Sequence, residues 1–270
     1  MAVASETLTN FARLFEQRHQ YAREWKERTG RKVLGFFCTY APEEIIHAAG
    51  MLPVRIFGSH QVQDITDRHI FPVWCPYCRD CLYEGLSGRY DYLDGVVNAW
   101  CCQHIRGTYI SWWRHIKTIS YHHVIYWPVP LHTEHSRVVA TKGFERFKGT
   151  LEELTGTPIT PQALHQAIGV YNRSRRLMRE VYELRKRPHP PITGAQTMAL
   201  VVASQVMDKT EHSRLVEQAL PELSAAPGIP NPGPRLMIMG SENDDRELVA
   251  FIESLGATVV IDDHCTGSKY

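Results

Sequence analysis

The chain has 270 residues, of which 43% are hydrophobic and 22% are charged, and its formal net charge is +1. This composition is typical of a globular protein with a substantial core, and the length allows one large domain or two modest ones. The balanced charge gives no reason to expect binding to nucleic acid or to a membrane surface. No apolar stretch is long enough for a membrane span, and the N-terminal segment lacks the pattern of a signal peptide, so we expect a cytoplasmic location.

The N-terminal part of the chain predicts a strand–helix–strand unit. Apolar residues recur at helical spacing over 5–29 and predict a helix there. The apolar run 32–40 predicts a buried strand, and a proline with two glutamates begins a helix expected over 42–50. A second apolar run, 53–57, predicts the next strand. Two strands joined by a helix are the repeating unit of a parallel sheet.

The middle of the chain continues this alternation. The segment 161–187 carries seven basic residues between 173 and 187. We interpret them as a solvated helix face, with a site for an anionic ligand or a partner as the alternative. The expected strands are 93–98 and 123–129, and the expected helices are 80–86, 103–116, 143–155, 161–187, 195–207 and 211–220.

The clearest boundary is the segment 225–234, which contains four prolines and two glycines and predicts a linker. We expect a first α/β domain over 1–224, with a helical region over 143–224. A second α/β domain is expected to begin at 235–270 and to be incomplete, because one strand–helix–strand unit cannot bury both faces of its sheet. Its elements are expected at 235–239, 244–255 and 258–262.

The placement of cysteines is the most informative chemical feature. The chain has seven cysteines, and five of them lie between 75 and 102. An odd number cannot be fully paired within one chain. In a reducing compartment, such a group indicates metal binding or redox chemistry rather than disulfides.

Spacing alone leaves several interpretations of these cysteines open. Cys75, Cys78 and Cys81 have the spacing of a ferredoxin-like cluster site, but the usual fourth cysteine is missing. A structural zinc site could combine the first two with the adjacent pair at 101–102 or with His104. Cysteines from separate loops could also hold an iron–sulfur cluster. Buried thiols without any ligand are the remaining alternative.

Several segments together resemble the 2-hydroxyacyl-CoA dehydratase and benzoyl-CoA reductase family, and they follow the family's order over essentially the whole chain. WKERTG at 25–30 favours the smaller, cluster-bearing subunit of a benzoyl-CoA reductase. The other matching segments are GFFCTYAPEEIIHAAGMLPVRI at 35–56, CPYCR at 75–79, LSGRYDYLDG at 86–95, the cysteine at 102, PRLMIMGS at 234–241 and DDHCTGSKY at 262–270.

The resemblance implies a cofactor, partners and site residues. Two related subunits each carry a [4Fe-4S] cluster held by three cysteines, with the acyl-CoA substrate between them. A separate ATP-hydrolysing iron–sulfur activator supplies low-potential electrons. In this chain the first two ligands match Cys75 and Cys102, and the third is expected beyond Tyr270. Glu44 matches a recurrent family glutamate and is the candidate proton donor. The alternative is that its carboxylate only interacts favourably with the dipole at the start of a helix.

Neighbouring side chains are expected to support this site. We interpret Cys78, Cys81 and Cys101 as buried thiols near it, with exchangeable ligation as the alternative, and Cys38 as a core residue. His104 is either a packed residue or a donor to the cluster sulfurs. The three tryptophans between 100 and 113 are expected to shield the site from water and oxygen, and ordinary aromatic packing explains them equally well.

Together these features predict an α/β fold with two Rossmann-like parallel-sheet domains and added helices, the second domain being truncated. The expected function is a subunit of an ATP-dependent benzoyl-CoA reductase-type enzyme that transfers electrons to an aromatic acyl-CoA. One alternative is a subunit of an (R)-2-hydroxyacyl-CoA dehydratase. The other is a non-catalytic paralogue with structural zinc or no metal. The chain has no glycine-rich phosphate-binding loop, so we do not expect it to hydrolyse ATP itself.

Overall fold

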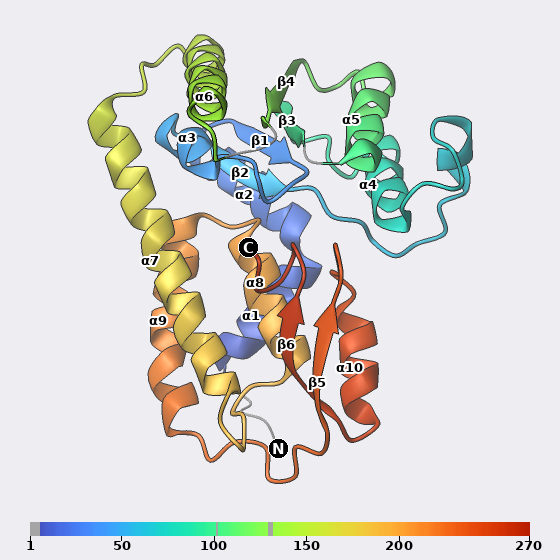
Figure 1. The fold of residues 1–270 in the computed structure, drawn as a ribbon, viewed down its shortest axis with the longest axis vertical. Coiled ribbons are helices and arrows are strands. Elements are labelled where there is room, and N and C mark those ends of the chain that lie inside the picture. The colour runs from blue at the N-terminus through green and yellow to red at the C-terminus, as the bar shows by residue number, and fades with distance from the viewer. Residues whose placement is uncertain (1–5, 101, 129–131) are drawn as a thin grey trace. The chain divides into compact units, whose positions relative to one another are not determined.

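The computed structural model describes residues 6–100, 102–128 and 132–270. It has a mixed α/β fold with one parallel sheet of four strands and another of two strands, each accompanied by helices (Figure 1). The chain divides into two compact units. One unit comprises Ala22–Ile168. The other consists of residues 6–21 together with Gly169–Tyr270. The fold class expected from the sequence is confirmed.

The four-stranded sheet lies in the unit Ala22–Ile168, and its strands follow the order β2-β1-β3-β4. All neighbouring strands are parallel. Successive strands are added first on one side of β1 and then on the other, so the strand order reverses between β1 and β3. In open parallel sheets, ligands bind at such a reversal, beyond the carboxyl ends of the strands. The strands are β1 (Val33–Phe36), β2 (Leu52–Arg55), β3 (Gly95–Trp100) and β4 (Tyr121–Tyr126).

One face of this sheet is covered by α3 (Glu43–Ala48) and α6 (Glu134–Thr155) (Figure 1). Alternate residues of a strand point to opposite faces, and Phe36 is directed to this one. It belongs to a buried cluster with Ile46 of α3 and Phe147 of α6, all fully buried. These contacts hold α3 against the sheet and so set the position of α3 relative to the end of β1.

The opposite face is covered by α4 (Pro76–Leu86) and α5 (Gln103–His115). Phe37, the next residue along the chain from Phe36, meets the ring of Trp112 on α5 edge-on, with centroids 5.3 Å apart. Gly85 on α4 lets the two helices approach closely, because a Cβ at this position would lie 2.5 Å from the Trp112 ring. The two helices therefore pack side by side.

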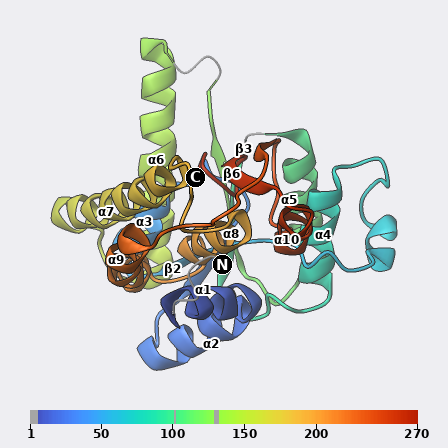
Figure 2. The same cartoon turned by 90° about the horizontal axis from the view of Figure 1, so that it is seen from below.

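The other unit is built around α8, whose side chains are almost all buried. A helix that is hydrophobic on all sides requires cover from several neighbours, and α1 and α9 both pack on it. Figures 1 and 2 show α1 beside α8. The two-stranded parallel sheet also belongs to this unit. Its elements are α1 (Glu6–Glu16), α8 (Gly194–Ser204), α9 (Lys209–Ala225), β5 (Arg235–Met239), α10 (Arg246–Ser254) and β6 (Thr258–Asp263).

Two long segments differ slightly from the expectations. The helix expected over 5–29 is two helices, α1 and α2 (Arg18–Thr29), although the N–H of Gln17 still donates to the carbonyl of Arg13 between them. The basic segment forms α7 (Pro161–Arg185), which runs from one unit into the other. The domain division expected at the Pro/Gly linker concerns independent folding and stays a prediction. Within the described ranges, no helix is long and apolar enough to cross a membrane.

Candidate functional site

Cys75 occupies the N-cap of α4, directly before a proline in the first turn. Proline is well suited to this place because the first N–H groups of a helix have no partner within it. The thiol of Cys78 and the main-chain N–H groups of Tyr77 and Cys78 point at the Cys75 sulfur, and His104 lies nearby. These donors lower the pKa of Cys75 to about 5, with the Cys78 thiol contributing most and partial burial opposing the shift. Cys75 therefore carries a thiolate at neutral pH, the form that binds metals.

Cys102 occupies the equivalent place on the next helix. It is the N-cap of α5, and its sulfur accepts a hydrogen bond from the N–H of Ile105 at 3.4 Å. The side chain is exposed. The N-terminus of a helix carries partial positive charge, so the field of α5 at this position favours negative charge. The two cysteines singled out from the sequence are thus both helix N-caps.

A short junction holds these two helix starts together. The N–H of Cys75 donates to Nδ1 of His104, in the first turn of α5, at 2.9 Å. Trp74 stacks on the His104 ring, with centroids 5.3 Å apart and planes 16° apart. Gly107 makes room for Trp74, because a Cβ there would lie 1.8 Å from the indole. Both Cys75 and Cys102 contribute to raising the pKa of Cys78, which indicates that the three sulfurs lie close together.

The neighbouring cysteines of α4 are buried, as the sequence predicted. The carbonyl of Cys78 accepts from Thr108 and that of Cys81 accepts from Trp112, so α5 is pinned along α4. The neighbouring thiol of Cys75, together with burial, raises the pKa of Cys78 far above its usual range and keeps that thiol neutral. Cys38 is also buried, in the core cluster of the opposite face. Cys101, also predicted to be a buried thiol, lies outside the described residues.

Glu44 lies in the first turn of α3, which follows the carboxyl end of β1. Cys102 follows the carboxyl end of β3, the strand next to β1, so both residues lie beyond the same edge of the sheet. Glu44 is half-buried, whereas Glu43 beside it is only 5% exposed. The role of Glu44 as a proton donor stays a prediction.

Trp74 is a site residue that the sequence reasoning missed. The sequence pointed to the tryptophans between 100 and 113, of which Trp112 is fully buried in the core and Trp113 is 58% exposed. Trp74 instead packs directly beside the cysteine junction. Its position immediately before Cys75 was the available signal.

Asn98 is a second residue that the sequence reasoning missed. It is fully buried in β3, and neither atom of its side-chain amide has a hydrogen-bond partner among the described residues. Asn98 shares a strand face with Trp100, whose ring lies 3.9 Å under the guanidinium of Arg106 on α5. Buried side-chain amides without partners are rare in folded proteins, because leaving their hydrogen bonds unmade costs free energy. A single asparagine in an otherwise apolar strand was the signal.

The donor set fits a thiolate-bound group in part. Cys75 and Cys102 supply two sulfurs at helix N-termini, which is the chemistry that iron–sulfur clusters and zinc require. Across the described residues, however, no three Cys, His, Asp or Glu side chains form a group that could hold a metal ion.

Fold and site together define a parallel α/β protein with a cysteine pair beyond the carboxyl edge of its sheet. The chain belongs to the 2-hydroxyglutaryl-CoA dehydratase D-component family, whose model matches residues 38–270. The resemblance of the sequence to this family is thereby confirmed.

Three relatives illustrate the range of the family. A benzoyl-CoA reductase subunit of Thauera aromatica is 32% identical over 250 residues, which cover 90% of this chain and 64% of that protein. The (R)-phenyllactyl-CoA dehydratase beta subunit of Clostridium sporogenes is 26% identical over 269 residues, covering 97% and 70%. The beta subunit of (R)-2-hydroxyglutaryl-CoA dehydratase of Acidaminococcus fermentans is 29% identical over 213 residues, covering 78% and 56%. The chain thus spans 56% to 70% of the length of these relatives.

Proposed function

We propose that the chain is a subunit of a benzoyl-CoA reductase-type enzyme that transfers low-potential electrons to an aromatic acyl-CoA. The observation that carries the proposal is the pairing of Cys75 and Cys102 at two adjoining helix starts. The 32% identity to a benzoyl-CoA reductase subunit supports the choice of reaction. The proposed partners are a homologous second subunit and a separate ATP-hydrolysing iron–sulfur activator, in the cytoplasm.

Cys75 and Cys102 are the proposed ligands of a [4Fe-4S] cluster, and the remaining ligand is proposed to come from outside the described residues. When bound, such a cluster supplies single electrons at low potential and, with three cysteine ligands, one iron position open to an oxygen atom. The chain's own contribution is to position the two cysteine sulfurs at the adjoining starts of α4 and α5. Cys75 is already a thiolate at neutral pH, so binding requires no costly loss of its proton.

The surrounding residues have positioning roles in this proposal. His104 accepts from the N–H of Cys75 and so keeps the starts of α4 and α5 in register. Trp74 covers one side of His104 and limits the access of water. Glu44, half-buried beyond the same sheet edge, is proposed to hold the proton that the reduced acyl group needs.

A subunit of an (R)-2-hydroxyacyl-CoA dehydratase is the second candidate. It is favoured by the description of the matching family and by the names of two of the relatives. The same cysteine pair would serve both reactions. The two are distinguished by substrate, since a dehydratase acts on a 2-hydroxyacyl-CoA and a reductase on benzoyl-CoA. Anaerobic assays of the purified complex with each thioester decide between them.

The cluster itself is tested by metal analysis. Iron, acid-labile sulfide and zinc are measured, with EPR spectra, on anaerobically purified wild-type protein and on Cys75→Ser and Cys102→Ser variants. We expect about four irons and four sulfides per chain in the wild type and a large loss in both variants, as for a [4Fe-4S] site. Cys265→Ser is the matched control, because this half-buried cysteine lies in the other unit. Zinc, or no metal in a folded wild-type protein, would support the non-catalytic paralogue instead.

A further inference from the structure

Cys78 is a buried thiol to which the proposed function gives no role, although it lies beside a proposed ligand. Two residues separate it from Cys75, and together they begin α4 between the strands β2 and β3. Its thiol forms a hydrogen bond with the Cys75 sulfur. Two cysteines with this spacing inside a strand–helix–strand unit are typical of redox-active dithiols. The contact places the two sulfurs where a bond between them can form.

The backbone geometry brings the Cys75 sulfur over the first turn of α4. Cys75 is the N-cap and has non-helical backbone angles, with φ at −47° and ψ at 126°. Cys78 lies in the first turn, and residues three apart at a helix start share one face. The N–H groups of Tyr77 and Cys78 also point at the Cys75 sulfur. A bond between the two sulfurs closes a loop within one turn, so it leaves α4 in place.

The two sulfurs differ in their access to solvent. Cys75 is half-buried, whereas Cys78 is only 2% exposed. A small molecule therefore reaches the sulfur of Cys75 first, and Cys78 reacts only through it. Exchange with a small disulfide requires this division, because its first step forms a mixed disulfide that a second, neighbouring thiol must then break.

Two other cysteines lie near this pair but are less well placed to react with Cys75. Cys81 is fully buried, and its thiol donates to the carbonyl of Ile56 at 3.6 Å. Cys102 is exposed and caps a different helix, where its sulfur accepts from a main-chain N–H of the first turn. A bridge from Cys75 to Cys102 would give up this hydrogen bond and tie two helices together. Of these three neighbours, Cys78 is the best placed, because it lies in the helical turn that Cys75 caps.

We propose that Cys75 and Cys78 form a redox-active dithiol in the chain without a bound cluster, and that they exchange with small disulfides of the glutathione type. The Cys75 sulfur attacks one sulfur of the small disulfide, which forms a mixed disulfide and releases one thiol. The Cys78 sulfur then attacks the Cys75 sulfur, which forms the internal disulfide and releases the second thiol. The protein loses two electrons and two protons, and the small disulfide takes them up as two thiols.

The internal disulfide occupies a sulfur that the cluster needs, so oxidation and cluster binding exclude each other. This consequence rests on the proposed function, whereas the disulfide itself rests on the contact between the two sulfurs. The bond also keeps Cys75 from further oxidation to sulfinic and sulfonic acids, which thiols cannot reverse. A chain that lacks its cluster is thereby held in a form that a thiol can restore.

The test is disulfide mapping on the full purified chain. Bound metal is removed with a chelator, and the chain is incubated anaerobically with oxidised glutathione. Trypsin cleaves after Arg68 and Arg79 and releases a peptide, residues 69–79, that contains both cysteines and no other. We expect this peptide to lose two hydrogens and its reactivity toward iodoacetamide, and dithiothreitol to restore both. A bridge from Cys75 to another cysteine, or unchanged thiols in this peptide, overturns the proposal.

Cys78→Ser and Cys81→Ser form a matched pair of variants. Each removes one buried thiol from α4, but of the two only the Cys78 thiol forms a hydrogen bond with the Cys75 sulfur. We expect Cys78→Ser to stop at the mixed disulfide, which adds one glutathione to the peptide 69–79. Cys81→Ser should form the internal bridge as the wild type does. A missing glutathione adduct in Cys78→Ser, or a lasting one in Cys81→Ser, overturns the assigned roles.

Cys102→Ser separates this inference from the proposed function. It removes a proposed cluster ligand but no member of the pair, so we expect the disulfide to form as in the wild type, and its loss would overturn the redox pair alone. Iron uptake is then compared between reduced and oxidised wild-type chain. We expect the oxidised chain to take up several-fold less iron until dithiothreitol is added, and equal uptake would overturn the exclusion of the cluster. A disulfide in a chain that takes up no iron in either form would support the redox pair and contradict the proposed function.

Discussion

The main-chain N–H of Cys75 donates a hydrogen bond to Nδ1 of His104 at 2.9 Å, so the residue that caps α4 is fastened to the first turn of α5. A ring nitrogen that accepts a hydrogen bond carries no proton, which places the imidazole proton on Nε2. Cys102 lies two residues before His104 and caps α5 itself. The contact therefore couples the positions of both proposed ligands.

Replacing His104 tests this coupling. We expect His104→Ala to lower the iron content per chain several-fold and to reduce the free energy of unfolding by up to about 1 kcal/mol, because one exposed hydrogen bond and the stacking of Trp74 on the imidazole are lost. His104→Asn places a carbonyl oxygen near the position of Nδ1 and should restore part of both quantities. Metal analysis and urea unfolding give the two readouts. Equal iron content in the wild type and the alanine variant would show that the contact does not position the site.

Replacing Gly107 by alanine is expected to destabilise the protein, although a glycine-to-alanine change inside a helix normally stabilises it. Alanine normally stabilises a helix interior by about 1 kcal/mol relative to glycine. At Gly107 the added Cβ would lie 1.8 Å from the Trp74 ring, so Trp74 must leave its place on His104. We expect Gly107→Ala to destabilise the protein and to change its near-ultraviolet circular dichroism and tryptophan fluorescence.

Gly149 is the matched control for this substitution. It lies inside α6, and no atom comes within 4 Å of a Cβ built there. Gly149→Ala should therefore stabilise the protein by up to about 1 kcal/mol and leave the tryptophan signals unchanged. The same sign for both variants would contradict the packing described for Trp74.

Much of the fold could be predicted from the sequence because its signals are local. Apolar runs, caps and prolines are legible within one element, and they predicted every strand of the sheet β2-β1-β3-β4 within a few residues. The meeting of Cys75 with His104 is different, because it depends on how α4 and α5 pack. That packing requires a glycine at position 85, and the place of Trp74 on His104 requires a glycine at position 107. In sequence, both look like ordinary helix-weakening residues.

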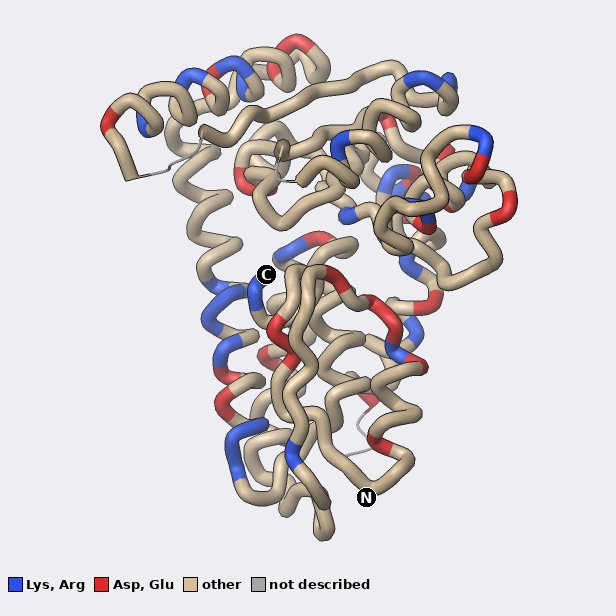
Figure 3. The backbone as a smooth tube through the Cα atoms, turned by 45° about the vertical axis from the view of Figure 1, so that its right-hand side comes forward, with Lys and Arg blue, Asp and Glu red and all other residues tan. Residues whose placement is uncertain are grey.

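The basic helix α7 illustrates the same limit at the surface (Figure 3). Arg176 and Arg179 lie on one helix with the same charge and similar exposure, and spacing cannot distinguish them. Of the two, only Arg179 lines the cavity that α7 forms with α8 and the loop after β6, and the position of that loop depends on the tertiary fold. Asn98 was missed for a related reason, since the cost of an unpartnered amide depends on burial that tertiary structure creates.

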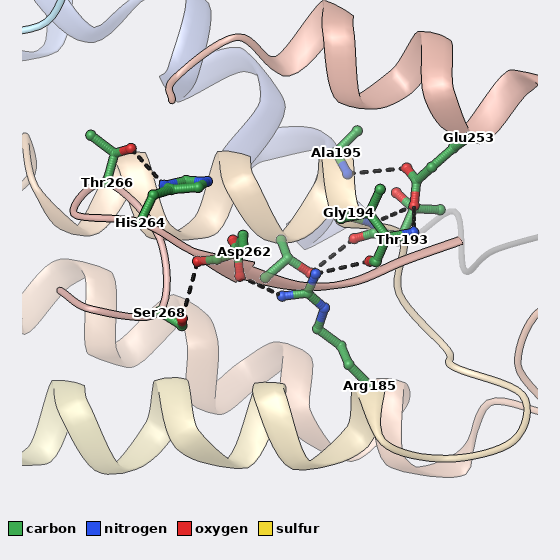
Figure 4. Close-up of polar contacts among 11 residues, drawn as sticks. Arg185, Thr193, Gly194, Ala195, Glu253, Asp262, His264, Thr266 and Ser268 are labelled. Atoms are coloured by element: carbon green, nitrogen blue, oxygen red, sulfur yellow. Dashed lines mark hydrogen bonds and ion pairs between the residues drawn. The ribbon is translucent and has the colours of Figure 1, made fainter. Parts of the chain in front are cut away.

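The ion pair of Arg185 and Asp262 predicts a large effect on stability. Both side chains are buried, with 1% and 5% of their surfaces exposed, and Arg185 also donates to the carbonyl of Val259 at 2.9 Å (Figure 4). Removing one partner leaves the other charge buried without compensation, which typically costs about 3–5 kcal/mol. We expect this loss for Arg185→Met in urea unfolding.

The exposed Arg176 provides the control, because Arg176→Met should change the free energy of unfolding by less than about 0.5 kcal/mol. The double variant Arg185→Met with Asp262→Asn should lose less than the sum of its two single variants, since it leaves no unpaired charge. Strict additivity would mean that the two side chains do not stabilise each other.

His212 predicts the pH dependence of stability. It is fully buried, and its Nε2 lies 3.0 Å from the carbonyl of Leu200. Burial, assisted by the charge of Lys209, lowers the pKa of His212 from 6.5 to about 3. The unfolded chain therefore takes up a proton between these values while the folded protein does not. Stability is full above pH 6.5 and is lost as the pH falls toward 3, by up to about 1.4 kcal/mol per pH unit.

His212→Gln isolates this contribution, because the glutamine amide can donate to the Leu200 carbonyl without titrating. Between pH 7 and pH 5 we expect the wild type to lose about 2 kcal/mol more of its free energy of unfolding than the variant does. Urea unfolding at both pH values, for both proteins, gives the comparison. Parallel losses in the two proteins would mean that His212 is already protonated in the folded state or accessible to water, and would contradict its burial against Phe11, whose ring centroid lies 5.4 Å away.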